Sequence, residues 1–193
     1  MKNFIDNLKP ISGEATISLC NIATGYAKRR EREILEAIKS NVSWAEYRRL
    51  VDDFHRMFLV RQFVAHNVIC DNGKAVLARI LANDFTYTGV PNYCALGTGT
   101  SAGVHTDTKL GTEAYRKLIA AKTFVGLATY LSTFFSATEC SGTYKEIGHF
   151  IDGTAAADSG QIWSHIGDPD TAELPVTKNT SSSLTIDYKS LFN

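Results

Sequence analysis

The sequence predicts a mainly β fold: a β-sandwich or jelly-roll-like domain that carries an inserted helical hairpin and one short additional helix. Short apolar segments alternate with turns rich in glycine, aspartate and serine from residue 92 to the end of the chain. Apolar residues at helical spacing occur in residues 28–58 and 73–81. With 193 residues, the chain fits a single domain over residues 1–193.

The first predicted strand covers residues 15–22. Ile17 and Leu19 alternate there with Thr16 and Ser18, which is the two-residue period of a strand with one buried face.

Two helices follow, over residues 28–39 and 43–58. Ser43 and Glu46 have the spacing of a capping box, in which both side chains satisfy free N–H groups at the start of a helix. A short turn joins the helices, so we interpret residues 28–58 as a helical hairpin inserted between two strands of the domain.

A strand over residues 59–69 and a short helix over residues 73–81 come next, and we expect Asp71 and Asn72 to cap that helix. The remaining predicted strands cover residues 92–96, 114–124, 127–137, 143–151, 161–166 and 184–188. Aspartates in the intervening turns, such as Asp152 and Asp158, are typical of turns because the carboxylate bonds nearby N–H groups.

One predicted strand, residues 127–137, has bulky residues on both faces. Leu131 and Phe135 lie on one face, and Tyr130 and Phe134 lie on the other. We expect this strand to lie in the middle of a sandwich or against a neighbouring subunit.

Composition excludes several classes of protein. Apolar residues make up 44% and charged residues 21%, which is ordinary for a soluble globular domain, and the net charge is zero. We therefore expect no nucleic-acid partner, because phosphate binding needs a basic surface. The sequence has neither an apolar signal segment at its start nor the ~18 apolar residues of a membrane span, so no membrane partner is expected.

The four cysteines, Cys20, Cys70, Cys94 and Cys140, are widely separated. We interpret them as buried thiols in a reducing compartment, with a disulfide pair as the alternative. No short-spaced ligand pair indicates zinc, and no cofactor is expected.

Residues 99–103 (GTSAG) fit G-x-S-x-G, the nucleophile-elbow pattern of serine hydrolases, with His105 and Asp107 nearby. An elbow must lead into a helix, whereas the residues that follow are polar and typical of a loop. The glycine spacing also departs from the dinucleotide-binding fingerprint. We interpret the segment as a glycine-rich loop and expect the chain not to be an enzyme.

Other clusters also have a structural interpretation. His149 and His165 lie in predicted strands and could be neighbours. We interpret them as polar positions at a sheet surface or a subunit contact, with a metal pair as the alternative. The turn aspartates are too dispersed for a calcium loop. The arginines and lysines of residues 28–49 are interleaved with glutamates, which favours a solvated helix face or a contact with a partner protein.

Aromatic residues of the hairpin and of strand 127–137 are the candidate interface residues, because aromatic side chains carry much of the energy of protein interfaces. A local core around the hairpin is the alternative for each of them. The candidates are Trp44, Tyr47, Phe54, Phe58, Tyr130 and Phe134.

The chain also carries six short motifs outside the hairpin. They are residues 13–19 (GEATISL), 66–74 (HNVICDNGK), 93–100 (YCALGTGT), 107–116 (DTKLGTEAYR), 142–150 (GTYKEIGHF) and 175–186 (PVTKNTSSSLTI). In this order they resemble a family of small structural proteins of tailed-phage virions. The resemblance implies a tail, baseplate or fibre component without catalysis, and the hairpin departs from it as an added docking element.

We therefore expect a non-catalytic structural component of a tailed-phage virion, in the tail or its attachment region. It would form a homo-oligomer, dock to other virion structural proteins, and pass from the host cytoplasm into the virion. The alternative is a receptor- or glycan-binding module or a capsid decoration protein. For that alternative, Trp163 and the loops between Asp152 and Asp170 are the candidate sugar-binding residues.

Overall fold

The computed structural model describes residues 11–168 and 174–192, and the predicted mainly β class is confirmed. Its helices are α1 (Gly25–Lys39), α2 (Trp44–Phe58) and α3 (Asp71–Leu81). Its first strands are β1 (Ser12–Asn21), β2 (Leu59–Ile69), β3 (Pro91–Gly97), β4 (Glu113–Leu118), β5 (Ala121–Val125) and β6 (Ala128–Phe135). The later strands are β7 (Gly142–Tyr144), β8 (Glu146–Ile151), β9 (Gln161–Gly167), β10 (Val176–Lys178) and β11 (Ser182–Leu191).

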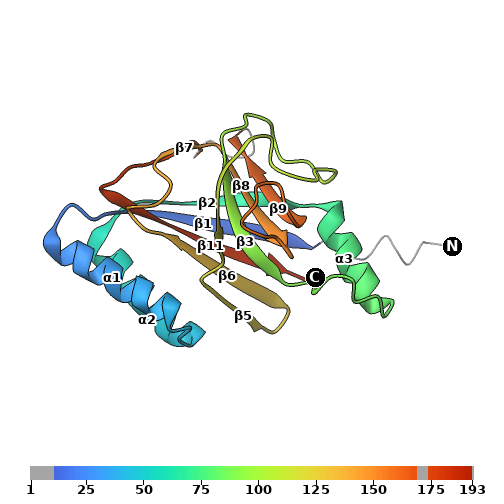
Figure 1. The fold of residues 1–193 in the computed structure, drawn as a ribbon, viewed down its shortest axis with the longest axis horizontal. Helices are drawn as coiled ribbons and strands as arrows, with labels where there is room; N and C mark the ends of the chain where they lie inside the picture. The colour runs from blue at the N-terminus through green and yellow to red at the C-terminus, as the bar shows by residue number, and fades with distance from the viewer. Residues whose placement is uncertain (1–10, 169–173, 193) are drawn as a thin grey trace.

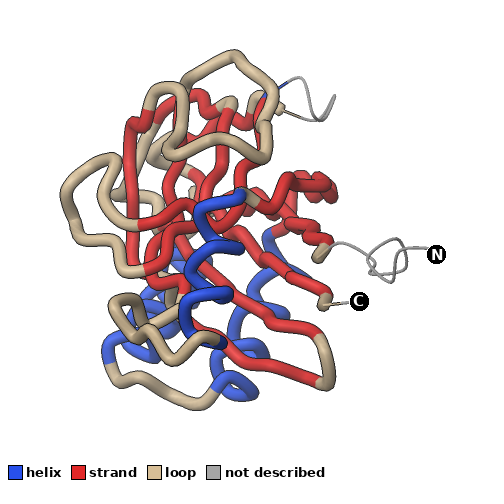
Figure 2. Tube along the Cα trace, turned by 90° about the vertical axis from the view of Figure 1, so that its right-hand side faces the viewer, coloured by secondary structure: helices blue, strands red, loops and turns tan. Residues whose placement is uncertain are grey.

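Nine of these strands form one curled antiparallel sheet in the order β4-β3-β8-β9-β2-β1-β11-β6-β5. The curl is visible in two perpendicular views (Figures 1 and 2). It brings two halves of the sheet face to face, as in a β-sandwich. β2 joins the halves on one side, because it pairs with β1 along most of its length and with β9 at Val68 and Ile69.

The other side of the sandwich is joined by the chain itself between β4 and β5. The N–H of Ile119 donates to the carbonyl of Asn92 in β3, whereas the N–H of the next residue, Ala120, donates to the carbonyl of Ser132 in β6. The predicted strand 114–124 is therefore two strands, because the chain changes halves at this corner. The predicted strand 143–151 is likewise divided, into β7 and β8, and β10 was not predicted.

The space between the halves holds the main hydrophobic core. Its fully buried members include Ile17, Leu96, Ile147, Ile166 and Ile186, which come from strands of both halves. Burial of large aliphatic side chains at about 25 cal/mol per Å² is the main driving force for closing the sandwich.

The α1–α2 hairpin covers the outer face of the β1–β11–β6 half (Figure 1). Phe54 packs edge-to-face on Phe134 with ring centroids 6.0 Å apart, and the Tyr47 hydroxyl lies 2.9 Å from the Ser132 hydroxyl. Strand β6 is thus apolar on both faces because one face meets the core and the other meets this hairpin of the same chain.

The helix starts differ in how they are capped. The Ser43 hydroxyl accepts the N–H of Glu46, which confirms the Ser43 half of the predicted capping box of α2. The predicted cap of the third helix is wrong: α3 begins at Asp71 after Cys70, which makes no side-chain cap. The Asp71 carboxylate instead bonds Lys74 and His105.

All four cysteines are free thiols. Burial raises the pKa of Cys20, Cys70 and Cys94 to about 12 and that of the half-buried Cys140 to about 11. These thiols are unreactive because little thiolate forms at neutral pH. Among the described residues, no helix has the length and apolar character needed to cross a membrane.

Candidate functional site

The fully buried carboxylate of Glu146 organises the loop that contains the glycine-rich motif. It accepts backbone N–H groups of Gly99 (2.8 Å), Gly111 (2.8 Å) and Thr112 (3.1 Å). Charge-assisted bonds of this kind compensate for removing the carboxylate from water. Glu146 therefore holds both ends of the loop over residues 98–112 against β8.

Glycines surround this carboxylate because no side chain fits beside it. A Cβ atom added at Gly97, Gly99 or Gly111 would lie less than 3.0 Å from a Glu146 oxygen, closer than real Cβ contacts. The motifs at residues 93–100 and 142–150 are therefore two parts of one buried site.

His165 extends this site toward the loop. Its Nδ1 lies 2.7 Å from Asp107 Oδ2, its Nε2 lies 3.3 Å from Glu146 Oε1, and its side chain is 3% exposed. The imidazole thus lies between two carboxylates, one on the loop and one on β8, and holds the loop against the sheet.

The G-x-S-x-G pattern lies in this loop, and the next regular element is the strand β4. Ser101 is exposed, His105 Nδ1 lies 2.7 Å from Asp71, and Asp107 bonds His165. The segment is therefore a glycine-rich loop, and its histidine and aspartate each bond a different partner.

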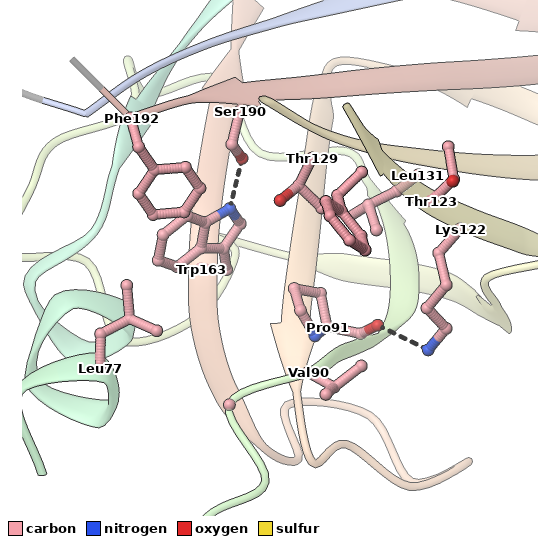
Figure 3. Close-up of a pocket in the computed structure, with 12 residues that line it drawn as sticks. Leu77, Val90, Pro91, Lys122, Thr123, Thr129, Leu131, Trp163, Ser190 and Phe192 are labelled. Atoms are coloured by element: carbon pink, nitrogen blue, oxygen red, sulfur yellow. Dashed lines mark hydrogen bonds between the residues drawn. The ribbon is translucent and has the colours of Figure 1, made fainter. Parts of the chain in front are cut away.

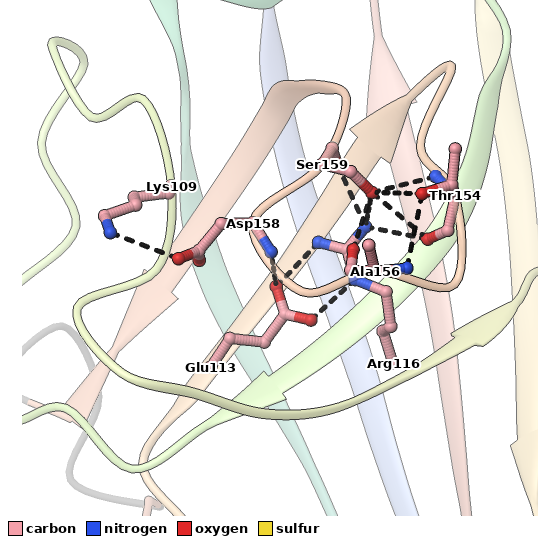
Figure 4. Close-up of polar contacts among 7 residues, drawn as sticks. All are labelled: Lys109, Glu113, Arg116, Thr154, Ala156, Asp158 and Ser159. Carbon is pink, nitrogen blue, oxygen red and sulfur yellow. Dashed lines mark hydrogen bonds and ion pairs between the residues drawn. The ribbon is translucent and has the colours of Figure 1, made fainter.

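A second buried cluster joins β4 to the turn before β9 (Figure 4). Arg116 donates from Nε to Glu113 Oε1 (2.5 Å) and from Nη2 to Oε2 (2.6 Å). The two side chains are only 4% and 2% exposed. Nη1 donates to the carbonyl oxygens of Thr154 (3.1 Å) and Ser159 (3.0 Å), so the guanidinium fixes the conformation of this turn.

The register of β8 and β9 contradicts the alternative of a metal pair at His149 and His165. Gly148 pairs with His165 and His149 pairs with Ser164, so the two histidines lie on opposite faces of the sheet. His149 packs on the ring of Tyr188 with centroids 4.3 Å apart. Within residues 11–168 and 174–192, no three His, Cys, Asp or Glu side chains are placed so that they could hold a metal ion.

The buried His149 makes stability depend on pH. Burial lowers its pKa to about 3 from the ordinary value of 6.5. As the pH falls below 6.5, the unfolded chain binds a proton on His149 and the folded protein does not, so the folded state loses stability. We expect a loss of about 1.6 kcal/mol between pH 6.5 and pH 5 from this residue.

Urea unfolding of the wild type and of His149→Phe at several pH values from 5 to 7 tests this expectation. The variant keeps a ring against Tyr188 and should show a shallower pH dependence. His66→Phe, at an exposed position, is the control and should keep the wild-type slope. Equal slopes for wild type and His149→Phe would contradict the assignment.

Three of the six candidate interface residues are used inside the chain. Tyr47, Phe54 and Phe134 are at most 1% exposed and form the contact between hairpin and sheet. The alternative, a local hairpin core, is correct for these three because the outer face of β6 is covered by α2.

The other three candidates are partly exposed. Phe58 packs against Phe54 and Tyr26, with centroids 5.0 and 5.8 Å apart. The ring of Trp44, at the start of α2, lies beside the ring of Tyr130 in β6 with centroids 6.5 Å apart. These two rings line a groove on the surface.

An apolar pocket of about 450 Å³ opens between β5 and the start of β3 (Figure 3). Trp163 lines it and donates from Nε1 to Ser190 Oγ (3.0 Å). Lys122 stands at its edge and donates to the Pro91 carbonyl (3.2 Å). The remaining lining residues are Leu77, Gly89, Val90, Thr123, Phe124, Thr129, Leu131 and Phe192.

The tip of the β5–β6 hairpin beside this pocket is apolar and exposed. Phe124, Val125 and Leu127 are 77%, 67% and 68% exposed. Gly126, with φ +58°, forms the tight turn between them. Sequence reasoning missed this tip, although three large apolar residues around a turn glycine are an unusual pattern for a turn.

The sugar-binding candidates are positioned differently from the prediction. Trp163 is only 4% exposed. Asp152 accepts bonds from Thr88, and Asp158 pairs with Lys109 (3.1 Å). Asp168 lies 3.6 Å from Lys145, and Asp170 lies outside the described residues.

Comparisons of the chain with protein-family models, curated proteins and solved structures gave no match.

Proposed function

We propose that this chain is a non-catalytic structural component of a tailed-phage virion that acts by self-association and docking. The proposed place is the tail or its attachment region, reached from the host cytoplasm. The motif resemblance supports the class of protein. The buried positions of Glu146, Glu113 and Arg116 also support it, because the motif residues serve to hold loops in a rigid shape.

The observation that carries the proposal is the exposed apolar tip on an edge strand. In the described part of the chain, β5 has a strand on one side only, and its tip exposes Phe124, Val125 and Leu127. A free edge with apolar side chains is a site for pairing with another strand.

A second copy of this chain is the proposed occupant. A two-fold axis beside β5 pairs the strand antiparallel with itself and places each Phe124 near the other copy's pocket. Phe124 and the pocket lie at the same edge, so the surface supplies both an apolar projection and an apolar cavity. Zero net charge adds no long-range repulsion between copies. A stable pair needs roughly 800 Å² per partner, so the pocket rim must contribute along with the tip.

The mass of the purified protein in solution tests the self-association. We expect a mass of twice 21.2 kDa for the wild type, and a return to 21.2 kDa for Phe124→Asp and for Leu127→Asp. Val60→Asp is the control, because Val60 is 65% exposed on the distant strand β2. A wild-type monomer at ~100 µM would reject the self-pairing.

Mass spectrometry of purified phage particles tests the virion location. We expect peptides of this chain in the particles, and their absence would reject the proposed location.

A further inference from the structure

The groove beside Trp44 has the features of a second ligand site, which shares only Thr123 and Leu131 with the apolar pocket. It lies between the start of α2 and the outer face of β11 and β6, and its volume is about 430 Å³. Ligand pockets typically span about 300–1,000 Å³ and place a few polar groups among apolar walls. The lining residues that the proposal uses are Trp44, Arg48, Asp52, Tyr130 and Asp187.

Two partly exposed aromatic rings form one wall. The Trp44 and Tyr130 rings are tilted by 46°, and Tyr47 lies behind Trp44 with centroids 6.3 Å apart. The guanidinium of Arg48 lies 5.9 Å from the Trp44 ring centroid. These contacts hold the indole in place while part of its surface stays open to a ligand.

The polar groups of the groove are held in fixed positions. Arg48 donates from Nη1 to Asp187 Oδ1 (2.6 Å) and from Nη2 to Asp52 Oδ1 (2.5 Å). Ser132 also donates to Asp187 Oδ1 (2.5 Å). The Oδ2 atoms of Asp187 and Asp52 accept no hydrogen bond from the described residues, which leaves them free to accept from ligand hydroxyls.

The geometry points to a neutral saccharide as the ligand of this groove. A pyranose presents an apolar C–H face that fits an aromatic ring and a rim of hydroxyls that fits fixed carboxylates and a guanidinium. Three carboxylates, Glu14, Asp52 and Asp187, face two cations, Arg48 and Lys189. This excess of negative charge disfavours sialic and uronic acids. Val125 of the exposed tip also lines this groove, whereas the groups assigned to the ligand, Trp44, Tyr130 and the carboxylates, lie outside the tip.

A glycan array tests the class of ligand. The probes are neutral oligosaccharides of glucose, galactose, mannose and N-acetylhexosamines, with sialylated counterparts beside them. We expect the full-length wild type to bind neutral probes and not the sialylated ones. Absence of binding to every neutral probe, or binding to sialylated probes alone, would overturn the proposal.

Fluorescence titration with the neutral oligosaccharide that binds best places the site. The chain has two tryptophans, so Trp163→Phe leaves Trp44 as the single reporter. We expect this variant to bind with the wild-type Kd and to show a saturable change in Trp44 emission.

Substitutions in the groove complete the test. Trp44→Ala and Tyr130→Ala should each raise the Kd at least tenfold, measured by calorimetry, with thermal unfolding confirming the fold. Asp52→Asn is a milder third variant on the polar wall. The matched control is Tyr26→Ala, which removes a half-exposed aromatic ring elsewhere on the hairpin and should leave the Kd unchanged. Unchanged affinity in both folded groove variants would overturn the assignment to this groove.

Discussion

Replacing Glu146 with alanine is expected to destabilise the folded protein by about 4 kcal/mol, because three buried backbone N–H groups lose their acceptor. For a chain of this size, that corresponds to a Tm lower by roughly 10 °C. Chemical denaturation and a thermal melt measure both quantities.

Two further variants define the cause of that loss. Glu146→Gln keeps one oxygen and turns an NH₂ group toward backbone donors, so it should fall between the wild type and Glu146→Ala. Glu36→Ala removes a carboxylate that is 68% exposed and should leave the melt unchanged. A Glu146→Ala protein as stable as the wild type would show that Glu146 does not hold the loop.

Removing Arg116 is the second large expected effect. Arg116→Ala leaves the Glu113 carboxylate buried without its partner and should cost about 3–5 kcal/mol. Arg116→Lys keeps the charge but cannot form the paired bonds to Glu113 or reach the turn in the same geometry. It should therefore recover only part of the loss in denaturant unfolding.

A double-mutant cycle separates the ion pair from the other contacts of Arg116. Adding Glu113→Ala to Arg116→Ala should cost less than the sum of the single changes, since the unpaired carboxylate is gone. The matched control is Glu36–Lys39, which has the same three-residue spacing but side chains that are 68% and 69% exposed. Its coupling energy should be near zero. Equal coupling in the two cycles would mean that burial does not strengthen the Glu113–Arg116 pair.

The two predicted stability sites and the two proposed binding surfaces lie in different parts of the fold. Glu146 and Arg116 act on the β3–β4–β8 side, where the motifs of the chain meet. The hairpin tip and the Trp44 groove belong to the β6–β5 side and α2. Substitutions of Glu146 and Arg116 therefore test the stability of the fold. Substitutions in the hairpin tip and the groove test binding to a second copy and to a ligand.

Much of the candidate site could be recognised in the sequence as a set of motifs, but not as one site. Gly99 and Glu146 are 47 residues apart, and their contact depends on pairing of β3 with β8. Nothing in the local pattern indicates that the glycines are required by a carboxylate from another strand. The same holds for Arg116 and Ser159, which meet through the closing turn before β9.

The sequence by itself determined the elements whose pattern is local. The hairpin helices, the strand over residues 59–69 and the β class follow from periodicity, capping and turn residues, because each depends on neighbours within a few positions. Only the tertiary structure decided which faces are covered. The outer face of β6 is buried by α2, the strand over residues 114–124 divides at Ile119, and His149 and His165 lie on opposite faces. These outcomes depend on strand register and sheet closure, which join residues far apart in the chain and leave no local signal.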